Sequence, residues 1–216
     1  MAEQPLLYTY YRSSAAYRVR IALALKGISY ESIAVHLRKN EQQTESYRAL
    51  NPQGLIPTWV EGGHAISQSL AIIDYLEETH PEPSLFPKGP LARARVRQIA
   101  YSIACDIHPL NNLRVMRHLK NQCGLDDNAC TEWQRHWMAE GFAALENLLA
   151  HSPETGRYCH GDTPSMADLC LVPQLYNGRR AELDLSPYPT LLRIEAVCNA
   201  HPAFAAAHPA RQADAE

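Results

Sequence analysis

A proline-rich stretch, HPEPSLFPKGP at residues 80–90, constrains the fold of this chain more than any other feature. Proline removes a backbone donor and fixes φ, so closely spaced prolines end regular helices and strands. Strand-like patterns lie on the N-terminal side of this stretch, and no convincing strand pattern follows it. We therefore predict two domains, at residues 1–82 and 92–216, joined by a linker at 83–91.

The N-terminal domain is predicted to begin with a β-α-β unit. The strand-like runs LLYTYY and SYESIAVHL flank a helix expected at about residues 15–26. Two short strands then surround Gly62-Gly63, a pair typical of a hairpin turn, and another helix is expected at residues 69–79. This order of elements describes a thioredoxin-like α/β domain.

The second domain is predicted to be an all-α bundle. Its pattern indicates helices at about residues 92–120, 127–150, 165–178 and 188–200. Ser165 and Asp168 have the spacing of a capping box at the start of the third of these helices. The polar, alanine-rich tail after Pro209 is expected to be loose.

Composition excludes several classes of protein. The 216 residues are 46% hydrophobic, which is enough for a buried core, and the net charge of −3 without charged blocks argues against a nucleic-acid partner. Neither a secretory signal pattern nor an apolar run of membrane-spanning length is present, so we expect a cytoplasmic protein without a membrane partner. The six cysteines are scattered and expected to be reduced, and the ten histidines lack metal-ligand spacing.

Arg12, Ser13 and Ser14 stand where the first strand turns into the first helix. A helix N-terminus presents unpaired N–H groups and the positive end of the helix dipole, so a thiolate placed there is stabilised. A serine hydroxyl can add a further donor to the same sulfur, whereas in the alternative both serines only cap the helix. The local sequence leaves both roles open.

Six ordered segments resemble the zeta-class glutathione transferases, over about Leu6 to Pro209. They are RSSAAYRVRIALALKG, ALNPQGLIPTW, SQSLAIIDYLEE, CDIHPLNN, TPSMADLCLVPQ and DLSPYP. The resemblance implies the glutathione transferase fold, glutathione as the cofactor and a homodimer. The chain departs from the family's commonest Ser-Ser-Cys pattern by carrying Ala15, so the resemblance implies a nucleophile brought in by glutathione.

The resemblance also assigns residues to glutathione. Ser13 is expected at the sulfur with Ser14 close to it, and a cis peptide bond before Pro57 would expose the Ile56 backbone to the cysteinyl unit. The remaining residues that the resemblance assigns to glutathione are Gln68 and Ser69 at the γ-glutamyl carboxylate, Gln42 at the glycyl end, and His108 and Asn112 across the cleft. For His108, satisfying backbone groups at a proline kink stays an alternative.

The substrate implied by the resemblance is a small, doubly carboxylated, conjugated diketone with a cis double bond. Thiolate addition makes that bond single, rotation follows, and expulsion of the thiolate gives the trans isomer without a pair of acid and base carboxylates. Charge that develops on the adjoining carbonyl needs cations. Arg12 and Arg180 match family positions that face the substrate, and the neighbouring Arg179 is expected to be solvated.

The resemblance implies conversion of maleylacetoacetate to fumarylacetoacetate in the breakdown of tyrosine and phenylalanine. Isomerisation of maleylpyruvate in gentisate breakdown fits the same residues, and general glutathione conjugation or dehalogenation of α-halo acids is a further alternative. A scaffold without catalysis is disfavoured, because Ser13, Pro57, Gln68 and Ser69 are all present.

Overall fold

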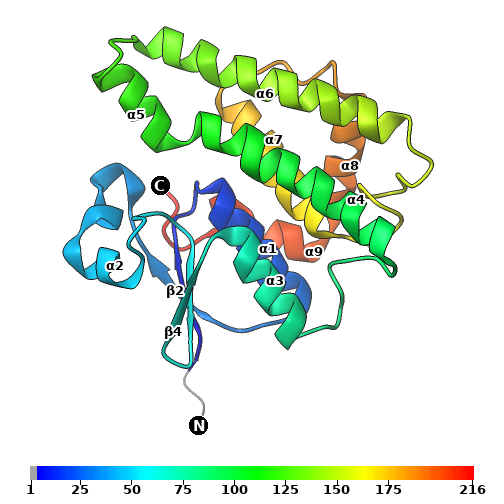
Figure 1. The fold of residues 1–216 in the computed structure, drawn as a ribbon, viewed down its shortest axis with the longest axis horizontal. Coiled ribbons are helices and arrows are strands. Elements are labelled where there is room, and N and C mark those ends of the chain that lie inside the picture. The colour runs from blue at the N-terminus through cyan, green and yellow to red at the C-terminus, as the bar shows by residue number, and fades with distance from the viewer. Residues whose placement is uncertain (1–3) are drawn as a thin grey trace. The chain divides into compact units, whose positions relative to one another are not determined.

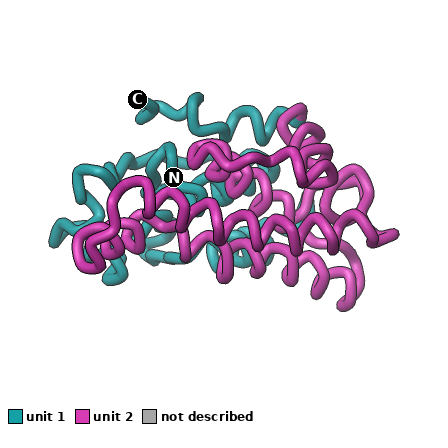
Figure 2. Tube along the Cα trace, turned by 90° about the horizontal axis from the view of Figure 1, so that it is seen from above, with its two compact units in different colours: residues 1–85, 201–216 teal, residues 86–200 magenta. Residues whose placement is uncertain are grey.

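The computed structural model describes residues 4–216, which form two compact units. Unit 1 contains the chain up to Leu85 together with residues 201–216, and unit 2 contains Phe86–Ala200 (Figure 2). Every helix within residues 4–216 is too short or too polar to cross a membrane.

Unit 1 is built on a four-stranded mixed sheet in the order β2-β1-β3-β4. Its strands are β1 (Leu6–Thr9), β2 (Glu31–Ala34), β3 (Thr58–Glu61) and β4 (His64–Ser67). β1 runs parallel to β2 and antiparallel to β3, which forms a hairpin with β4. The predicted β-α-β unit and hairpin are confirmed, and with the helices they give the expected thioredoxin-like arrangement.

Two helices of unit 1, α1 (Ser14–Lys26) and α3 (Ser69–Thr79), pack side by side (Figure 1). Each helix buries apolar side chains completely, with Ile21 and Leu23 on α1 and Ile72 and Leu76 on α3 at 0% exposure, which explains why both helices form where the pattern predicts them. Between β2 and β3 the chain forms two 3-10 turns and a short helix. These are η1 (Leu37–Lys39), η2 (Glu41–Gln43) and α2 (Glu45–Leu50).

Residues 201–216, called here the return segment, belong to unit 1, whereas the sequence-based domain boundaries include them in the helical domain. The segment contains α9 (Pro202–Ala207), which packs on α1, and η5 (Pro209–Arg211). Phe204 of α9 is fully buried, because an apolar side chain gains free energy on leaving water. The tail after Pro209 was expected to be loose, but it carries a hydrogen bond described below.

Unit 2 is helical throughout its regular structure. Its α-helices are α4 (Pro90–Tyr101), α5 (Leu113–Asn121), α6 (Asp127–Ala150), α7 (Met166–Arg180) and α8 (Pro189–Ala200). The predicted capping box at the start of α7 is present: fully buried Asp168 accepts the Ser165 N–H over 2.8 Å. Burial raises the pKa of Asp168, and its hydrogen bonds from Cys159 and Ser165 oppose that shift.

The predicted single helix over residues 92–120 is wrong. The chain passes from α4 into a π-helical segment, η3 (Ser102–Ile107), and a 3-10 turn, η4 (His108–Asn111), before α5 begins. Pro109 is the physical reason, because proline has no N–H to donate and its ring clashes with the carbonyl of the preceding turn. The interruption places His108 and Asn112 at the two ends of a short turn.

Candidate functional site

The turn that carries Ser13 is shaped by its own hydrogen bonds. The Ser13 N–H donates to the Tyr10 carbonyl over 2.9 Å, and Ser13 Oγ accepts the Ala16 N–H over 3.2 Å as the N-cap of α1. Accepting through the oxygen leaves the hydroxyl hydrogen available for donation. Capping the helix and donating to a sulfur are therefore compatible roles of one side chain.

The two neighbours of Ser13 differ in exposure. Ser14 is the first residue of α1 and is only 6% exposed, whereas Ser13 is half-buried. Arg12 is also half-buried, and its guanidinium lies 5.1 Å from the centre of the Tyr11 ring. Of the two serines, Ser13 thus offers the more accessible hydroxyl, with a cationic residue beside it in the chain.

The N-terminus of α3 forms a second polar centre in unit 1. Buried Ser69 accepts a hydrogen bond at Oγ from Nη1 of Arg18, over 3.2 Å. Gln68, just before it, has a φ of 72°, a conformation that costs free energy outside glycine and concentrates at functional sites. Its side chain donates to Gln53 over 2.7 Å. A helix N-terminus backed by a buried guanidinium suits a carboxylate.

The peptide bond between Ile56 and Pro57 is cis, as predicted. The carbonyl just before it, of Leu55, accepts hydrogen bonds from the Tyr47 hydroxyl over 2.6 Å and from Asn51 Nδ2 over 2.8 Å. These two side chains fix the backbone that leads into the turn.

Gln42 of η2 is 5% exposed, and its Oε1 is buried without a hydrogen-bond partner among the described residues. A buried polar atom without a partner is costly, so a bound ligand or water that pairs with it is the physical expectation. The Gln42 carbonyl would lie 3.0 Å from a Cβ placed on Gly54, so its backbone lies close to the cis-proline turn.

Unit 1 brings several of the predicted residues together. Ile56 belongs to the same apolar cluster as Tyr10, Tyr11 and Ala16, the residues that flank Ser13 in the chain. The Arg18 contact joins α1 to the N-terminus of α3. The Ser13 turn is therefore tied to the cis-proline turn through packing, and its helix is tied to Ser69 through a hydrogen bond.

His108, Asn112 and Arg180 belong to unit 2. Half-buried His108 begins η4, and Asn112 caps α5 by accepting the Arg114 N–H at Oδ1 over 3.1 Å. The sequence analysis missed buried Asn111, which anchors this turn: its Oδ1 accepts from Asn177 over 2.9 Å. The side chains of α6 add to this anchoring, because Trp133 and Gln134 donate to the carbonyls of η4.

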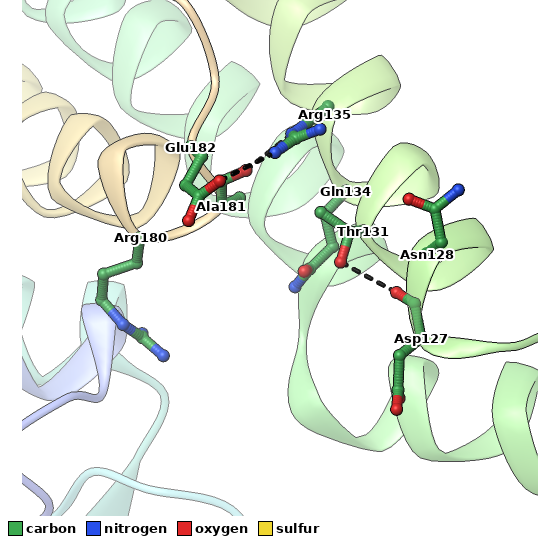
Figure 3. Close-up of a pocket in the computed structure, with 8 residues that line it drawn as sticks. All are labelled: Asp127, Asn128, Thr131, Gln134, Arg135, Arg180, Ala181 and Glu182. Atoms are coloured by element: carbon green, nitrogen blue, oxygen red, sulfur yellow. Dashed lines mark hydrogen bonds and ion pairs between the residues drawn. The ribbon is translucent and has the colours of Figure 1, made fainter.

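Arg180, the last residue of α7, lines a pocket of about 440 Å³ at the start of α6 (Figure 3). Arg135 of α6 donates to the Ala181 carbonyl over 2.7 Å and lies 3.5 Å from a Glu182 carboxylate oxygen. The Arg180 side chain points away from that ion pair, as Figure 3 shows. Arg135 thus fixes the end of α7, and Arg180 supplies a cation to the pocket wall.

Arg179 is exposed, as expected from the sequence, with 48% of its side chain accessible to solvent, but it also forms an ion pair that the sequence did not predict. Its two terminal nitrogens pair with the two carboxylate oxygens of Glu195 on α8, at 2.5 and 2.6 Å. Glu195 is buried, so the pair neutralises a carboxylate inside unit 2. The structure therefore separates the two adjacent arginines, one in an ion pair and one at a pocket.

Two buried arginines of α1, Arg18 and Arg20, also escaped the sequence analysis. A signal was present, because YRVRIALAL places arginines among apolar residues on every side of a helix and leaves them no broad polar face. Both are nearly inaccessible to solvent, which requires polar partners inside the unit.

Comparison with known families gives two matches. The model of the glutathione S-transferase N-terminal domain matches residues 7–84, and that of the glutathione S-transferase C-terminal domain matches residues 133–208. The chain is also 50% identical, over 212 residues, to the probable maleylacetoacetate isomerase of Vibrio cholerae serotype O1. That alignment covers 97% of this chain and 98% of the relative.

Solved structures resemble this one along nearly their whole length. A holo structure of maleylpyruvate isomerase, a bacterial zeta-class glutathione S-transferase, has a TM-score of 0.96 at 45% identity and covers 98% of this chain and 100% of its own. Maleylacetoacetate isomerase from Methylobacterium extorquens AM1, with bound malonate and GSH, has a TM-score of 0.96 at 43% identity, with 98% and 99% coverage.

Proposed function

The chain belongs to the zeta class of the glutathione S-transferase family, and we propose that it is a glutathione-dependent cis-trans isomerase that converts maleylacetoacetate to fumarylacetoacetate. The observation that carries this proposal is the Ser13 turn, where the hydroxyl of this half-buried serine caps a helix N-terminus beside Arg12. Isomerisation of maleylpyruvate is the second candidate, because a structure of that name matches with equal TM-score.

The residues of unit 1 fit glutathione. Ser69, oriented by Arg18 at the N-terminus of α3, suits the γ-glutamyl carboxylate, and the unpartnered buried oxygen of Gln42 is available to the other end of the tripeptide. When bound, glutathione supplies a thiol that adds reversibly to the double bond of the substrate. Ile56 and Pro57 then present backbone to its cysteinyl unit, and Ser13 donates to its sulfur.

Ser13 and the N-terminus of α1 favour the charged form of a thiol. If this turn lowers a thiol pKa from about 8.5 to about 6.5, the ionised fraction at pH 7 rises roughly 25-fold. Because intrinsic nucleophilicity falls with pKa, a Brønsted slope near 0.45 removes about eightfold, which leaves about threefold. Most of any large acceleration must then come from residues that orient the substrate and stabilise developing charge.

We assign that second role to Arg12 and Arg180. Both guanidiniums remain charged at any physiological pH and match the planar geometry of a carboxylate. Arg12 stands next to Ser13 in the chain. We propose that it stabilises the charge that develops on the substrate carbonyl adjoining the attacked double bond. Arg180 lines a pocket whose wall also carries Arg135, Asp127 and Glu182. His108 and Asn112, anchored through Asn111, are proposed to complete the glutathione site.

The resemblance supports a homodimer as part of the proposal, and the scattered free cysteines support a cytoplasmic location. Sedimentation at several protein concentrations measures the assembly directly.

The decisive experiment measures isomerase turnover of maleylacetoacetate and maleylpyruvate side by side, with and without glutathione. We expect turnover only with glutathione and a higher kcat/KM for maleylacetoacetate. A higher kcat/KM for maleylpyruvate selects the second candidate. Protein that binds glutathione but turns over neither compound contradicts both.

A further inference from the structure

We propose that the return segment positions the Ser13 turn, and that Arg20 and Asp214 are the positioning residues. The inference rests on the proposed role of Ser13 at the glutathione sulfur. It concerns contacts within unit 1 alone, and neither residue is assigned to glutathione or to substrate.

Arg20 of α1 joins three parts of unit 1. It is 1% exposed, and its guanidinium donates to the carbonyls of Tyr10 and Tyr11 over 3.3 and 3.0 Å and to Thr9 Oγ1 over 3.1 Å. Its Nε donates to the Ala207 carbonyl of the return segment over 3.2 Å. One rigid guanidinium thus fixes the end of β1, the residues before Ser13 and the end of α9 relative to one another.

Asp214 holds the same peptide from its other side. Its Oδ2 accepts the Tyr11 N–H over 2.9 Å, while the Tyr11 carbonyl is bound by Arg20. Both backbone polar groups of Tyr11 are therefore bound by charged side chains, and such hydrogen bonds are stronger than neutral ones.

The peptide between Tyr10 and Tyr11 is also hydrogen-bonded directly to Ser13. The Tyr10 carbonyl that accepts from Arg20 also accepts the Ser13 N–H over 2.9 Å. A shift of the Tyr10–Tyr11 backbone therefore moves the Ser13 hydroxyl. A misplacement of about 1 Å at a reacting centre can cost about 100-fold in rate.

Glu216 provides a contact of the same segment that involves a side chain beside the turn, because its partner His36 packs its ring 5.1 Å from that of Tyr10, and not the Tyr11 backbone. It pairs with Nε2 of His36 over 2.7 Å and is half exposed, and exposed ion pairs contribute little to stability. Glu216→Gln therefore removes a charge from the return segment without touching the Tyr11 peptide. It is the matched control for changes at Asp214.

Positioning and simple charge predict opposite results at Asp214. A carboxylate near the turn disfavours a thiolate, so removing its charge alone lowers the pKa of the bound thiol. Loss of positioning weakens the Ser13 contact and raises that pKa. Asp214→Ala removes both the charge and the acceptor, whereas Asp214→Asn keeps an oxygen that can accept the Tyr11 N–H.

The experiment titrates the thiol of protein-bound glutathione by its ultraviolet thiolate absorbance and measures kcat and KM for each variant. For Asp214→Ala we expect the thiol pKa to rise by about one unit, which lowers the ionised fraction at pH 7 about threefold from a pKa near 6.5, and kcat to fall by up to about that factor, with substrate KM unchanged. Asp214→Asn is expected to recover most of the lost kcat, and Glu216→Gln is expected to have the kcat and thiol pKa of the parent protein. A thiol pKa that stays constant or falls in Asp214→Ala overturns the proposal.

Arg20→Lys adds a second measurement, since lysine keeps the charge but cannot bind the carbonyls on both sides as a planar fork. We expect the thiol pKa to rise and kcat to fall in this variant too. If Arg20→Lys does not fold, the Asp214 variants alone test the proposal. Ser13→Ala distinguishes the proposed role of Ser13 from the proposed positioning role of Arg20 and Asp214. If it leaves the thiol pKa unchanged, the role of Ser13 itself fails; if only the Asp214 and Arg20 variants leave it unchanged, the positioning role fails.

Discussion

The buried guanidinium of Arg18 on α1 donates a hydrogen bond to the hydroxyl of Ser69, the first residue of α3, over 3.2 Å. Arg18 is 2% exposed and Ser69 is 5% exposed, so the contact is shielded from water. Hydrogen bonds to charged groups are worth more when they are buried. The pair therefore fixes the orientation of the serine oxygen at a helix N-terminus.

Ser69→Ala tests this pair. Losing a hydrogen bond to a charged group is expected to lower the free energy of unfolding by about 1.5–3 kcal/mol. The KM for glutathione should rise about tenfold because one contact of roughly 1.4 kcal/mol to its carboxylate is lost, while kcat at saturation changes little. Denaturant unfolding and steady-state kinetics measure both quantities. Exposed Ser46→Ala is the control, and an unchanged glutathione KM in Ser69→Ala would remove Ser69 from the binding site.

Ser13→Ala tests the double role of the N-cap. Loss of the cap is expected to cost about 1 kcal/mol of stability. Turnover at pH 7 should fall between about threefold and 25-fold, as the ionised thiol fraction and its nucleophilicity require. The acidic limb of the pH-rate profile should shift upward toward about pH 8.5, because an unassisted thiol ionises there. A profile that keeps its position would show that Ser13 only caps α1.

The sequence predicted the elements whose signals are local. The ranges 69–79 and 127–150 agree with α3 and α6, because capping residues and apolar spacing lie within each segment. The Gly62-Gly63 turn and the cis bond before Pro57 were also predicted, the latter from the family resemblance.

What the sequence missed depends on contacts between distant residues. Asp214 is bound to Tyr11, 203 positions away, and no local pattern reveals such a contact. The return segment was consequently included in the helical domain. The anchoring role of Asn111 was missed for the same reason, because its partner Asn177 lies on another helix. The ion pair of exposed Arg179 with Glu195 was missed as well, because its partner lies on another helix.

Substitutions of the two adjacent arginines at the end of α7 are expected to have separate effects, one on stability and the other on the KM for substrate. Arg179→Ala leaves Glu195 buried without its charged partner, so stability should fall by about 1–3 kcal/mol while KM stays nearly constant. Arg180→Ala should change stability by less than about 0.5 kcal/mol and raise substrate KM about tenfold or more. Unfolding and kinetics on the same two proteins measure this. The reverse pattern would assign the substrate to Arg179.

His208 makes the return segment sensitive to acid. Its Nδ1 accepts the Ala210 N–H over 3.2 Å as the cap of η5, and that nitrogen accepts only while it is unprotonated. Burial lowers the pKa of His208, and the nearby charges of Arg211 and Arg20 lower it further. The Tyr17 ring also packs against it edge-on.

The sign of the effect follows from linkage. Because the pKa of His208 is lower in the folded state, the unfolded chain binds more protons between that pKa and about 6.5, and stability rises with pH across this window. The contribution is fully present above about pH 6.5 and is lost on acidification. Asparagine caps with an oxygen that does not titrate, so His208→Asn should match the parent at pH 7.5 and lose less stability toward pH 5. Unfolding free energies at both pH values measure the difference, and parallel losses in the two proteins would exclude His208 as the source of the acid sensitivity.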